Sequence, residues 1–161
     1  MEKEIIEYIN YFDTTEDTKE KEKIIKSLRG MYKYMEGYHI KTNKQNIYIL
    51  IQGIQQCCEC WGYEACKEEG IIETKDDLQD FIGAELLSIE RVETENHNNI
   101  EISNKLEEKI KEDCFYYPDT EFINVKTSNG VLQFVLYNSH NGYYGHEVYI
   151  KFNDKEIRSF L

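Results

Sequence analysis

The sequence predicts an α+β protein, in which a mostly antiparallel β-sheet with one crossing helix is preceded by an N-terminal helical hairpin. Apolar residues recur at helical spacing over the first 37 residues, and from about residue 38 they alternate as they do in strands. A turn sequence joins two β-rich runs late in the chain. We therefore expect a helical extension at 1–37 and a core domain at 38–161, with a charged helical insert at about 96–120.

The N-terminal extension is predicted to hold two helices, over 4–12 and 16–36. The apolar stripe of the first is Ile5, Ile6, Ile9 and Phe12. The apolar stripe of the second is Ile24, Ile25, Leu28, Met31, Tyr32 and Met35. The segment DTTEDT between them breaks the pattern and offers several N-cap residues. Because an amphipathic stripe needs a partner, we expect the hairpin to pack on the core or on another copy, as a homodimer.

The first half of the core domain is predicted to form a strand, a short helix and a second strand. NIYILIQ at 46–52 is apolar on both faces, which is typical of a strand that is covered on both sides. ETKDDLQDFIG at 73–83 has Thr74 as its candidate N-cap and Asp77 three residues later, which indicates a short helix. AELLSIERVET at 84–94 is predicted to be a strand.

The second half of the core domain contains the clearest hairpin of the chain. NKLEEKIKED at 104–113 is predicted to be a charged helix within the insert. The hairpin follows at 121–138, where two β-rich runs meet at Asn129-Gly130. After it come the turn HNGYYGH and a last predicted strand, EVYIKF at 147–152.

The composition favours a soluble, cytoplasmic protein with reduced cysteines. The longest apolar run is far shorter than the roughly 18 residues that a membrane span needs. The N-terminus, MEKEIIEYIN, lacks the basic, apolar and small-residue regions of a secretory signal. The chain has five cysteines, and an odd number without a signal peptide argues against a disulfide framework.

The negative charge of the chain is concentrated in its middle. The formal net charge is −12, and residues 59–121 alone carry 19 acids and six bases, a balance of −13. Such a field repels nucleic acid and attracts basic surfaces, including the nucleic-acid channels of other proteins. The alternative is a solvated acidic face that only aids solubility.

The cysteine block QQCCECWGYEAC raises two chemical hypotheses. Thiolates crowded within ten residues suggest zinc, with Cys58 and Cys60 on one face of a strand and His140 or His146 completing the site. The spacing differs from the usual pair of C-x2-C knuckles, so we expect no zinc or other cofactor. The second hypothesis is a catalytic Cys58 with Glu59 and one of the two histidines. The alternative to both is that the cysteines are small apolar residues of the core.

The loop HNGYYGH is either a binding loop or a tight connection. Its glycines permit positive φ, and its tyrosines are suited to stacking on a base or anchoring a partner. A small-ligand site, for a nucleotide for example, would lie between this loop and the cysteine block. Its residues would be Cys58, Glu59, Tyr63, His140, Asn141, Tyr143, Tyr144 and His146. The chain has no phosphate-binding loop, no H-E-x-x-H and no G-x-S-x-G, so we predict no enzymatic activity.

Three blocks of the sequence, in order, resemble a family of small proteins from bacteriophages and mobile elements of Gram-positive bacteria. The blocks are QQCCECWGY, DDLQDFIGAELLSIE and FINVKTSNGVLQFVLYNSHNGYYGHEVYI. The family pattern is CCE-x-x-GY, then D-D-x6-GA-x-L, then YN-x-HNGYYGH, and the likeness covers about residues 45–95 and 121–152. The family is a domain of unknown function, so the resemblance implies a mobile-element context and no catalytic residues.

In that context the acidic middle of the chain predicts an inhibitory binding protein. Small acidic phage proteins without an enzyme motif are often inhibitors of host defence, so we expect an anti-CRISPR or other anti-defence protein that occludes a nucleic-acid-binding effector. The partner would be a protein with a basic nucleic-acid-binding surface, and neither nucleic acid nor membrane would be bound directly. The candidate contacts are Glu68, Glu69, Asp76, Asp77, Asp80, Glu107, Glu108 and Glu112.

Overall fold

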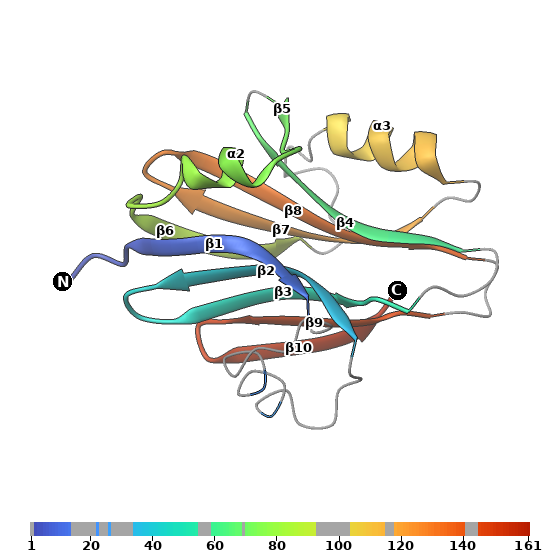
Figure 1. Ribbon diagram of the computed structural model, residues 1–161, viewed down its shortest axis with the longest axis horizontal. Helices are drawn as coiled ribbons and strands as arrows, with labels where there is room; N and C mark the ends of the chain where they lie inside the picture. Colours follow the sequence, from blue (N-terminus) through green and yellow to red (C-terminus); the bar gives the residue numbers. More distant parts are fainter. Residues whose placement is uncertain are drawn as a thin grey trace.

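The protein is built from two five-stranded antiparallel sheets that face one another, as the computed structural model shows (Figure 1). The structure describes residues 2–13, 22, 26, 34–54, 59–68, 70–92, 104–114, 118–140 and 145–161. Within these residues two short helices, α2 and α3, lie on the outside of the sheets. In the same part of the chain, no helix has the length and apolar character that crossing a membrane requires.

The first sheet has the strand order β1-β2-β3-β9-β10. Its strands are β1 (Ile6–Asp13), β2 (Met35–Thr42), β3 (Asn46–Gln52), β9 (Glu147–Phe152) and β10 (Lys155–Phe160). The strands predicted at 46–52 and 147–152 are confirmed as β3 and β9. Ile49 of β3 belongs to the core between the sheets, whereas Tyr48 and Leu50 join a smaller apolar cluster on the outer face. Strand β3 is therefore buried on both faces, as its sequence predicts.

The second sheet has the strand order β5-β4-β8-β7-β6. Its strands are β4 (Cys60–Lys67), β5 (Gly70–Ile71), β6 (Leu86–Val92), β7 (Asp119–Thr127) and β8 (Gly130–Ser139). The predicted hairpin is confirmed as β7–β8, but its turn consists of Ser128 and Asn129 and lies one residue earlier than predicted. Gly130, with φ 118°, forms the first cross-strand pair with Thr127. The Thr127 hydroxyl fixes this arrangement, because it donates to the Gly130 carbonyl and accepts the Asn129 N–H.

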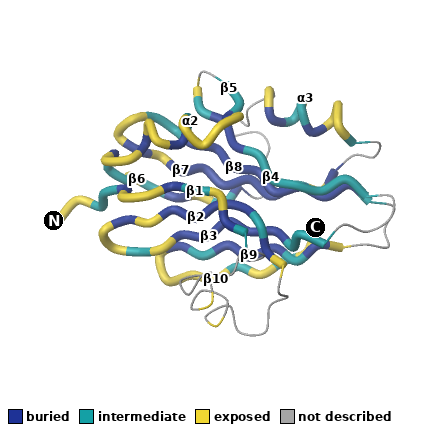
Figure 2. Tube along the Cα trace, in the orientation of Figure 1, coloured by how far each residue is buried: buried dark blue, intermediate teal, exposed yellow. Residues whose placement is uncertain are grey.

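The main core lies between the two sheets, whose strands are largely dark blue, the colour of buried residues, in Figure 2. It is dominated by β-branched and aromatic side chains, which suit the pleated surface of a sheet. Tyr38 of β2 crosses the interface and packs against Phe134 of β8, with 4.6 Å between the ring centroids. Both side chains are buried, so the contact joins the centres of the two sheets.

The two sheets are also joined along one edge, where β1 meets the start of β6. The Ile6 N–H donates to the Ala84 carbonyl at 2.9 Å, and the Gly83 N–H donates to the Ile6 carbonyl at 2.8 Å. Helix α2 (Lys75–Gln79) covers this edge and places Leu78 in the core. The predicted cap of α2 is confirmed, because the Thr74 N–H and hydroxyl both donate to Asp77 Oδ2.

Helix α3 (Asn104–Asp113) covers the outer face of the second sheet, and its bounds are those the sequence predicts. Leu106 and Ile110 of α3 pack with Phe122 and Val135 of the sheet in a separate apolar cluster. A disulfide between Cys60 in β4 and Cys114, just after α3, ties the end of the helix to the sheet.

The predicted N-terminal helical hairpin is wrong, and with it the α+β class: the protein is mostly antiparallel β. Residues predicted as the first helix form β1, which pairs with β2. Strand β2 begins at Met35, within the segment predicted as the second helix, and most of the rest of that segment lies outside the described residues. A β-bulge between Ile6 and Tyr8 explains the error. It brings Ile6 and Ile9 to the same face although they are three positions apart, while Phe12 is buried on the other face.

Candidate functional site

A buried acid–base pair, Glu59 and His146, lies at one end of the sandwich. Glu59 immediately precedes β4 and His146 immediately precedes β9. The Nε2 atom of His146 is 2.9 Å from Glu59 Oε2, and the Nδ1 atom is 2.5 Å from the backbone oxygen of Gln52, the last residue of β3. The side chains of His146 and Glu59 are 2% and 0% exposed. The fold therefore joins two residues that the sequence placed in one candidate site.

The partners of the His146 ring determine how many protons the pair holds. Both ring nitrogens face an oxygen, and a backbone carbonyl accepts hydrogen bonds but never donates them. The Nδ1 atom must therefore carry a proton. A second proton lies between Nε2 and the Glu59 carboxyl, as either an imidazolium–carboxylate pair or a neutral imidazole with a protonated acid. In both forms the two nitrogens of His146 are engaged, so neither offers a lone pair to a metal or a substrate.

The surroundings of the pair fix it to both sheets. Trp61 of β4 stacks on the His146 ring, with centroids 5.2 Å apart and an angle of 25° between the planes. The backbones of His146 and Leu161 exchange two hydrogen bonds, of 2.8 and 3.0 Å. The Leu161 carbonyl also accepts the side-chain amide of Asn138 in β8 at 3.0 Å. Residues of β3, β4 and β8 thus converge on His146, just before β9, and we call this arrangement a structural joint because it links the two sheets.

The other residues of the predicted ligand site are dispersed or lie outside the described residues. Tyr63 of β4 hydrogen-bonds with Glu36 and packs on Tyr38 at 5.4 Å between centroids. Burial raises the pKa of Tyr63 to about 12, and the nearby Glu36 carboxylate adds to the increase. His140 Nε2 is 4.0 Å from Asp119 Oδ2. The remaining candidates fall in segments that the structure does not describe: Cys58, Asn141, Tyr143 and Tyr144.

The arrangement of the cysteines differs from the reduced set that the sequence predicted. Cys60 pairs with Cys114 across 54 residues, with 5.7 Å between the Cα atoms. While this disulfide is intact, Cys60 has no thiolate to give to zinc. Cys66 is a buried thiol under α3. Within the described ranges no group of three or more His, Cys, Asp and Glu side chains could hold a metal ion.

Sequence reasoning missed Gln52 and Trp61 as parts of the buried site. Trp61 lies within the cysteine block of the sequence, and only the fold shows that its ring stacks on His146. Gln52 contributes through its backbone carbonyl, which no residue type specifies.

Gly62, within the cysteine block of the sequence, is required by close packing, because a Cβ atom there would lie 2.7 Å from the Tyr137 hydroxyl oxygen.

A second candidate site, the acidic surface, is formed by the predicted partner-binding acids. Helix α2, strand β5 and helix α3 all project above the second sheet in the view of Figure 1. The acids come from the turn before β5, from α2 and its end, and from α3. We define the acidic surface as Glu68, Asp76, Asp77, Asp80, Glu107, Glu108 and Glu112. The remaining candidate, Glu69, lies outside the described residues.

Lysines neutralise part of the acidic surface. Lys67 lies 2.9 Å from Asp80 and 3.5 Å from Asp77, and Lys111 lies 3.6 Å from Glu107. Hydrogen bonds from Thr74, together with Lys67, lower the pKa of the Asp77 carboxyl. Among the described residues, the exposed acids of this surface that make no ion pair are Glu68, Asp76, Glu108 and Glu112. The charge available to a partner is therefore smaller than the sequence balance suggests.

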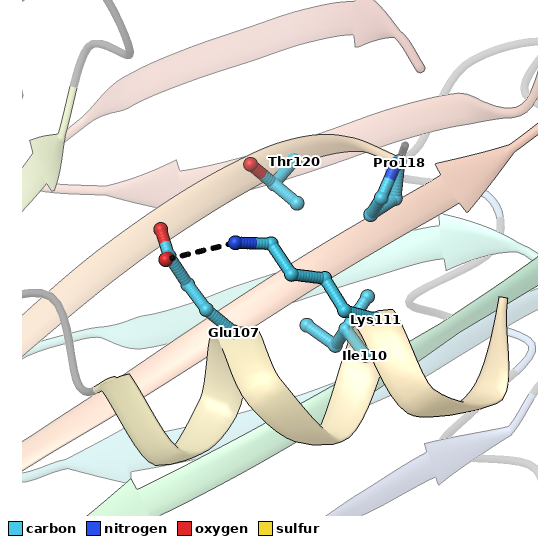
Figure 3. Close-up of a pocket in the computed structure, with 5 residues that line it drawn as sticks. All are labelled: Glu107, Ile110, Lys111, Pro118 and Thr120. Atoms are coloured by element: carbon cyan, nitrogen blue, oxygen red, sulfur yellow. Dashed lines mark ion pairs between the residues drawn. The ribbon is translucent and has the colours of Figure 1, made fainter. Parts of the chain in front are cut away.

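Figure 3 shows a small pocket between α3 and the start of β7. Its lining residues are Glu107, Ile110, Lys111, Pro118 and Thr120. Its volume of about 20 Å³ has room for one water molecule and not for a nucleotide. The pocket adds nothing to the case for a small-ligand site.

The fold and the two sites define a small, mostly antiparallel β protein with a buried acid–base joint and an acidic outer surface. The chain belongs to the family described as Domain of unknown function (DUF7448), which matches residues 10–150. The match runs from within β1 into β9 and ends before β10. No curated protein and no solved structure matches the chain.

Proposed function

We propose that this protein is a non-catalytic inhibitor, encoded by a phage or mobile element, whose acidic surface occludes the nucleic-acid-binding surface of a partner protein. An anti-CRISPR or other anti-defence protein is the class that fits. The observation that carries the proposal is the position of the exposed acids. They lie on two helices and a turn outside the sandwich, so a partner can reach them without disturbing the core.

The rigid attachment of these elements supports a mimic of phosphate charge. Helix α2 is anchored by Leu78 in the core, and α3 is anchored by Leu106, Ile110 and the disulfide at Cys114. Helices held in fixed positions lose little backbone entropy when a partner binds, which favours association. Their negative charge steers a basic surface toward them, and added salt screens this attraction.

The choice of residues for a test follows from the ion pairs. Asp77 caps α2 and Asp80 pairs with Lys67, so changing either would disturb the helix. Glu68 and Asp76 are exposed and take part in no such contact among the described residues. The double variant Glu68→Lys/Asp76→Lys reverses two charges on the acidic surface. Glu2→Lys/Glu7→Lys is a control for reversing two charges elsewhere, because both residues are exposed and lie on the N-terminal segment and β1. Glu7 pairs with the exposed Lys41 at 3.1 Å, so this control also removes one surface ion pair, which contributes little to stability.

The proposal is tested by capture from a bacterial lysate, treated with nuclease and analysed by mass spectrometry. Wild type and the control variant should retain the same nucleic-acid-binding protein, and Glu68→Lys/Asp76→Lys should lose it. A DNA or RNA oligonucleotide that binds the captured protein should displace it from wild type, because the two ligands share one surface. Capture that survives both the charge reversal and the oligonucleotide would contradict the proposal.

The alternative of a small-ligand or metal site has less support from the described residues. Both ring nitrogens of His146 are engaged, and Cys60 is part of a disulfide. The Tyr63 hydroxyl is hydrogen-bonded to Glu36, and both side chains are partly buried. Native mass spectrometry of the purified protein tests this alternative, because a bound metal or nucleotide would appear as a defined added mass.

A further inference from the structure

Helix α3 lies along strand β4, above the second sheet in the view of Figure 1, and several kinds of interaction attach it there. Just after the last turn of the helix, Cys114 forms the disulfide with Cys60, the first residue of β4. In the middle of the helix, Lys109 Nζ lies 3.0 Å from Glu64 Oε1. In its first turn, Leu106 packs in the apolar cluster on the outer face of the sheet. The disulfide is the covalent part of this attachment.

Helix α3 depends on its attachments because it is short and mostly polar. It has 10 residues, and helices shorter than about 12–15 residues are marginal in water on their own. Leu106 and Ile110 are its apolar side chains, and the other residues of the helix are charged or polar. The disulfide joins cysteines that are 54 residues apart, and a cross-link that closes so long a loop stabilises the folded arrangement substantially. Breaking the S–S bond should therefore make detachment of the helix more frequent.

The disulfide lies where a small thiol can reach it. Cys60 and Cys114 are both partly exposed, and they pack at the margin of the apolar cluster beneath α3. Cys66, inside the same cluster, is only 5% exposed. Thiol–disulfide exchange requires access of the attacking thiolate, and exposed disulfides are the labile and regulatory ones. The structure thus combines an accessible S–S bond with a buried thiol under the helix that the bond holds.

We propose that the Cys60–Cys114 disulfide is a reversible redox switch that controls the attachment of α3. The reductant is a low-molecular-weight thiol, such as glutathione. Its thiolate attacks one sulfur, the S–S bond breaks, and a mixed disulfide forms. A second thiol displaces the protein sulfur, so the protein gains two electrons and two protons while the two small thiols leave as their own disulfide. An excess of that small disulfide drives the reverse reaction.

Reduction has two consequences for the surface of the protein. Detachment of α3 uncovers the apolar cluster on the second sheet, and with it the Cys66 thiol. It also displaces Glu108 and Glu112, which α3 carries, whereas Glu68 and Asp76 stay in place. If the acidic surface binds a partner as proposed above, on which this step rests, reduction weakens that binding without abolishing it.

A redox titration of the full chain tests the switch without any partner. The protein is equilibrated in buffers of increasing ratio of reduced to oxidised glutathione and pulsed with N-ethylmaleimide. Peptide mass spectrometry then measures the Cys60–Cys114 bond and the alkylation of Cys66. The rate of Cys66 alkylation should rise at least about tenfold as the bond is reduced, with the same midpoint, and should fall again on reoxidation. Amide exchange of residues 104–113 should accelerate over the same range, while the strands of the first sheet stay protected.

The variant Cys60→Ser/Cys114→Ser is the control, because it has no bond to break. Its Cys66 should be alkylated rapidly at every glutathione ratio. A wild-type bond that stays intact across the series would overturn the proposal. So would reduction of the bond that leaves both the alkylation of Cys66 and the exchange of α3 unchanged. The titration of wild type gives either result even if the variant fails to fold.

The affinity of the captured partner separates this switch from the proposed function. Reduced wild type should bind the partner severalfold more weakly than oxidised wild type, and Cys60→Ser/Cys114→Ser should bind equally in both buffers. A partner that binds both forms of wild type equally, although α3 opens, would overturn the control of binding by the switch. Absence of any captured partner would contradict the proposed function, whereas the alkylation of Cys66 still decides whether the switch exists.

Discussion

The Glu59–His146 pair and the acidic surface use carboxylates in opposite ways. The Glu59 side chain is fully buried, and the His146 imidazole lies 2.9 Å from its oxygen. Glu68 and Asp76 are exposed and make no ion pair among the described residues. A buried carboxyl group needs a hydrogen-bond partner, whereas an exposed one is solvated and can be changed at little cost in stability. The carboxyl groups of the chain thus divide into some that hold the fold together and others that a partner can reach.

The largest effect that this comparison predicts is the loss of His146. His146→Ala removes the imidazole that hydrogen-bonds to the buried Glu59 carboxyl and leaves a cavity beside Trp61, which should lower the free energy of unfolding by about 2–4 kcal/mol. His140→Ala is the control, because that histidine is 4.0 Å from Asp119, which is exposed. Urea denaturation measures both. Equal losses in the two variants would show that the buried pair is not a structural joint.

The next effect concerns the attachment of α3, which carries part of the acidic surface. Replacing both cysteines of the disulfide, in Cys60→Ser/Cys114→Ser, should lower the free energy of unfolding by about 2–4 kcal/mol, because the cross-link closes a long loop. Hydrogen exchange should show faster opening of residues 104–113 in this variant. Cys66→Ala is the control for the loss of a cysteine beneath the helix. If exchange in α3 is unchanged, the disulfide does not hold the helix.

A smaller effect is expected on the pH dependence of the free energy of unfolding, through tyrosines whose pKa the fold raises. Burial raises the pKa of Tyr63 to about 12 from a usual value of 10.0, so the folded state favours the neutral phenol. The stability that this contributes is complete below pH 10.0 and is lost as the pH rises through about 12. Tyr63→Phe should reduce the fall in stability over that range, measured by urea unfolding at successive pH values. Tyr137→Phe should also reduce it, because burial raises the pKa of Tyr137 to about 12 as well.

The smallest effect on stability is expected at the acidic surface. Glu68→Lys/Asp76→Lys should change the free energy of unfolding by less than about 0.5 kcal/mol, because both side chains are solvated. The thermal unfolding midpoint measures this. A large destabilisation would mean that these acids belong to the structural part of the charge, and the distinction between the two regions would fail.

The fold was predictable where the local pattern had one interpretation. NIYILIQ was predicted as a strand covered on both faces, and the charged segment 104–113 was predicted as a helix with the same bounds as α3. The N-terminal prediction failed because a strand with a bulge, buried in part on both faces, repeats the spacing of a helix. A strand in the cysteine block was considered only as a setting for zinc ligands, so β4 was given no bounds, although its side chains alternate between the core and the α3 side.

The candidate site was predictable in its residues and not in its contacts. Glu59 and His146 were placed in one site because the two blocks that contain them carry four of the five cysteines and two of the four histidines of the chain. That His146 also contacts the Gln52 carbonyl, 94 positions away, depends on how β3 and β9 pair. The pairing of Cys60 with Cys114 likewise depends on the position of α3, which no spacing within the cysteine block encodes.

The most direct test of the central claim is the affinity of the captured partner for wild type and the two double variants, measured by titration calorimetry at low and high salt. An acidic surface that occludes a basic one predicts that Glu68→Lys/Asp76→Lys binds at least about tenfold more weakly than wild type at low salt. Glu2→Lys/Glu7→Lys should bind as wild type does, and the difference should shrink as salt screens the charges. Equal affinities of the two double variants, at both salt concentrations, would contradict the account.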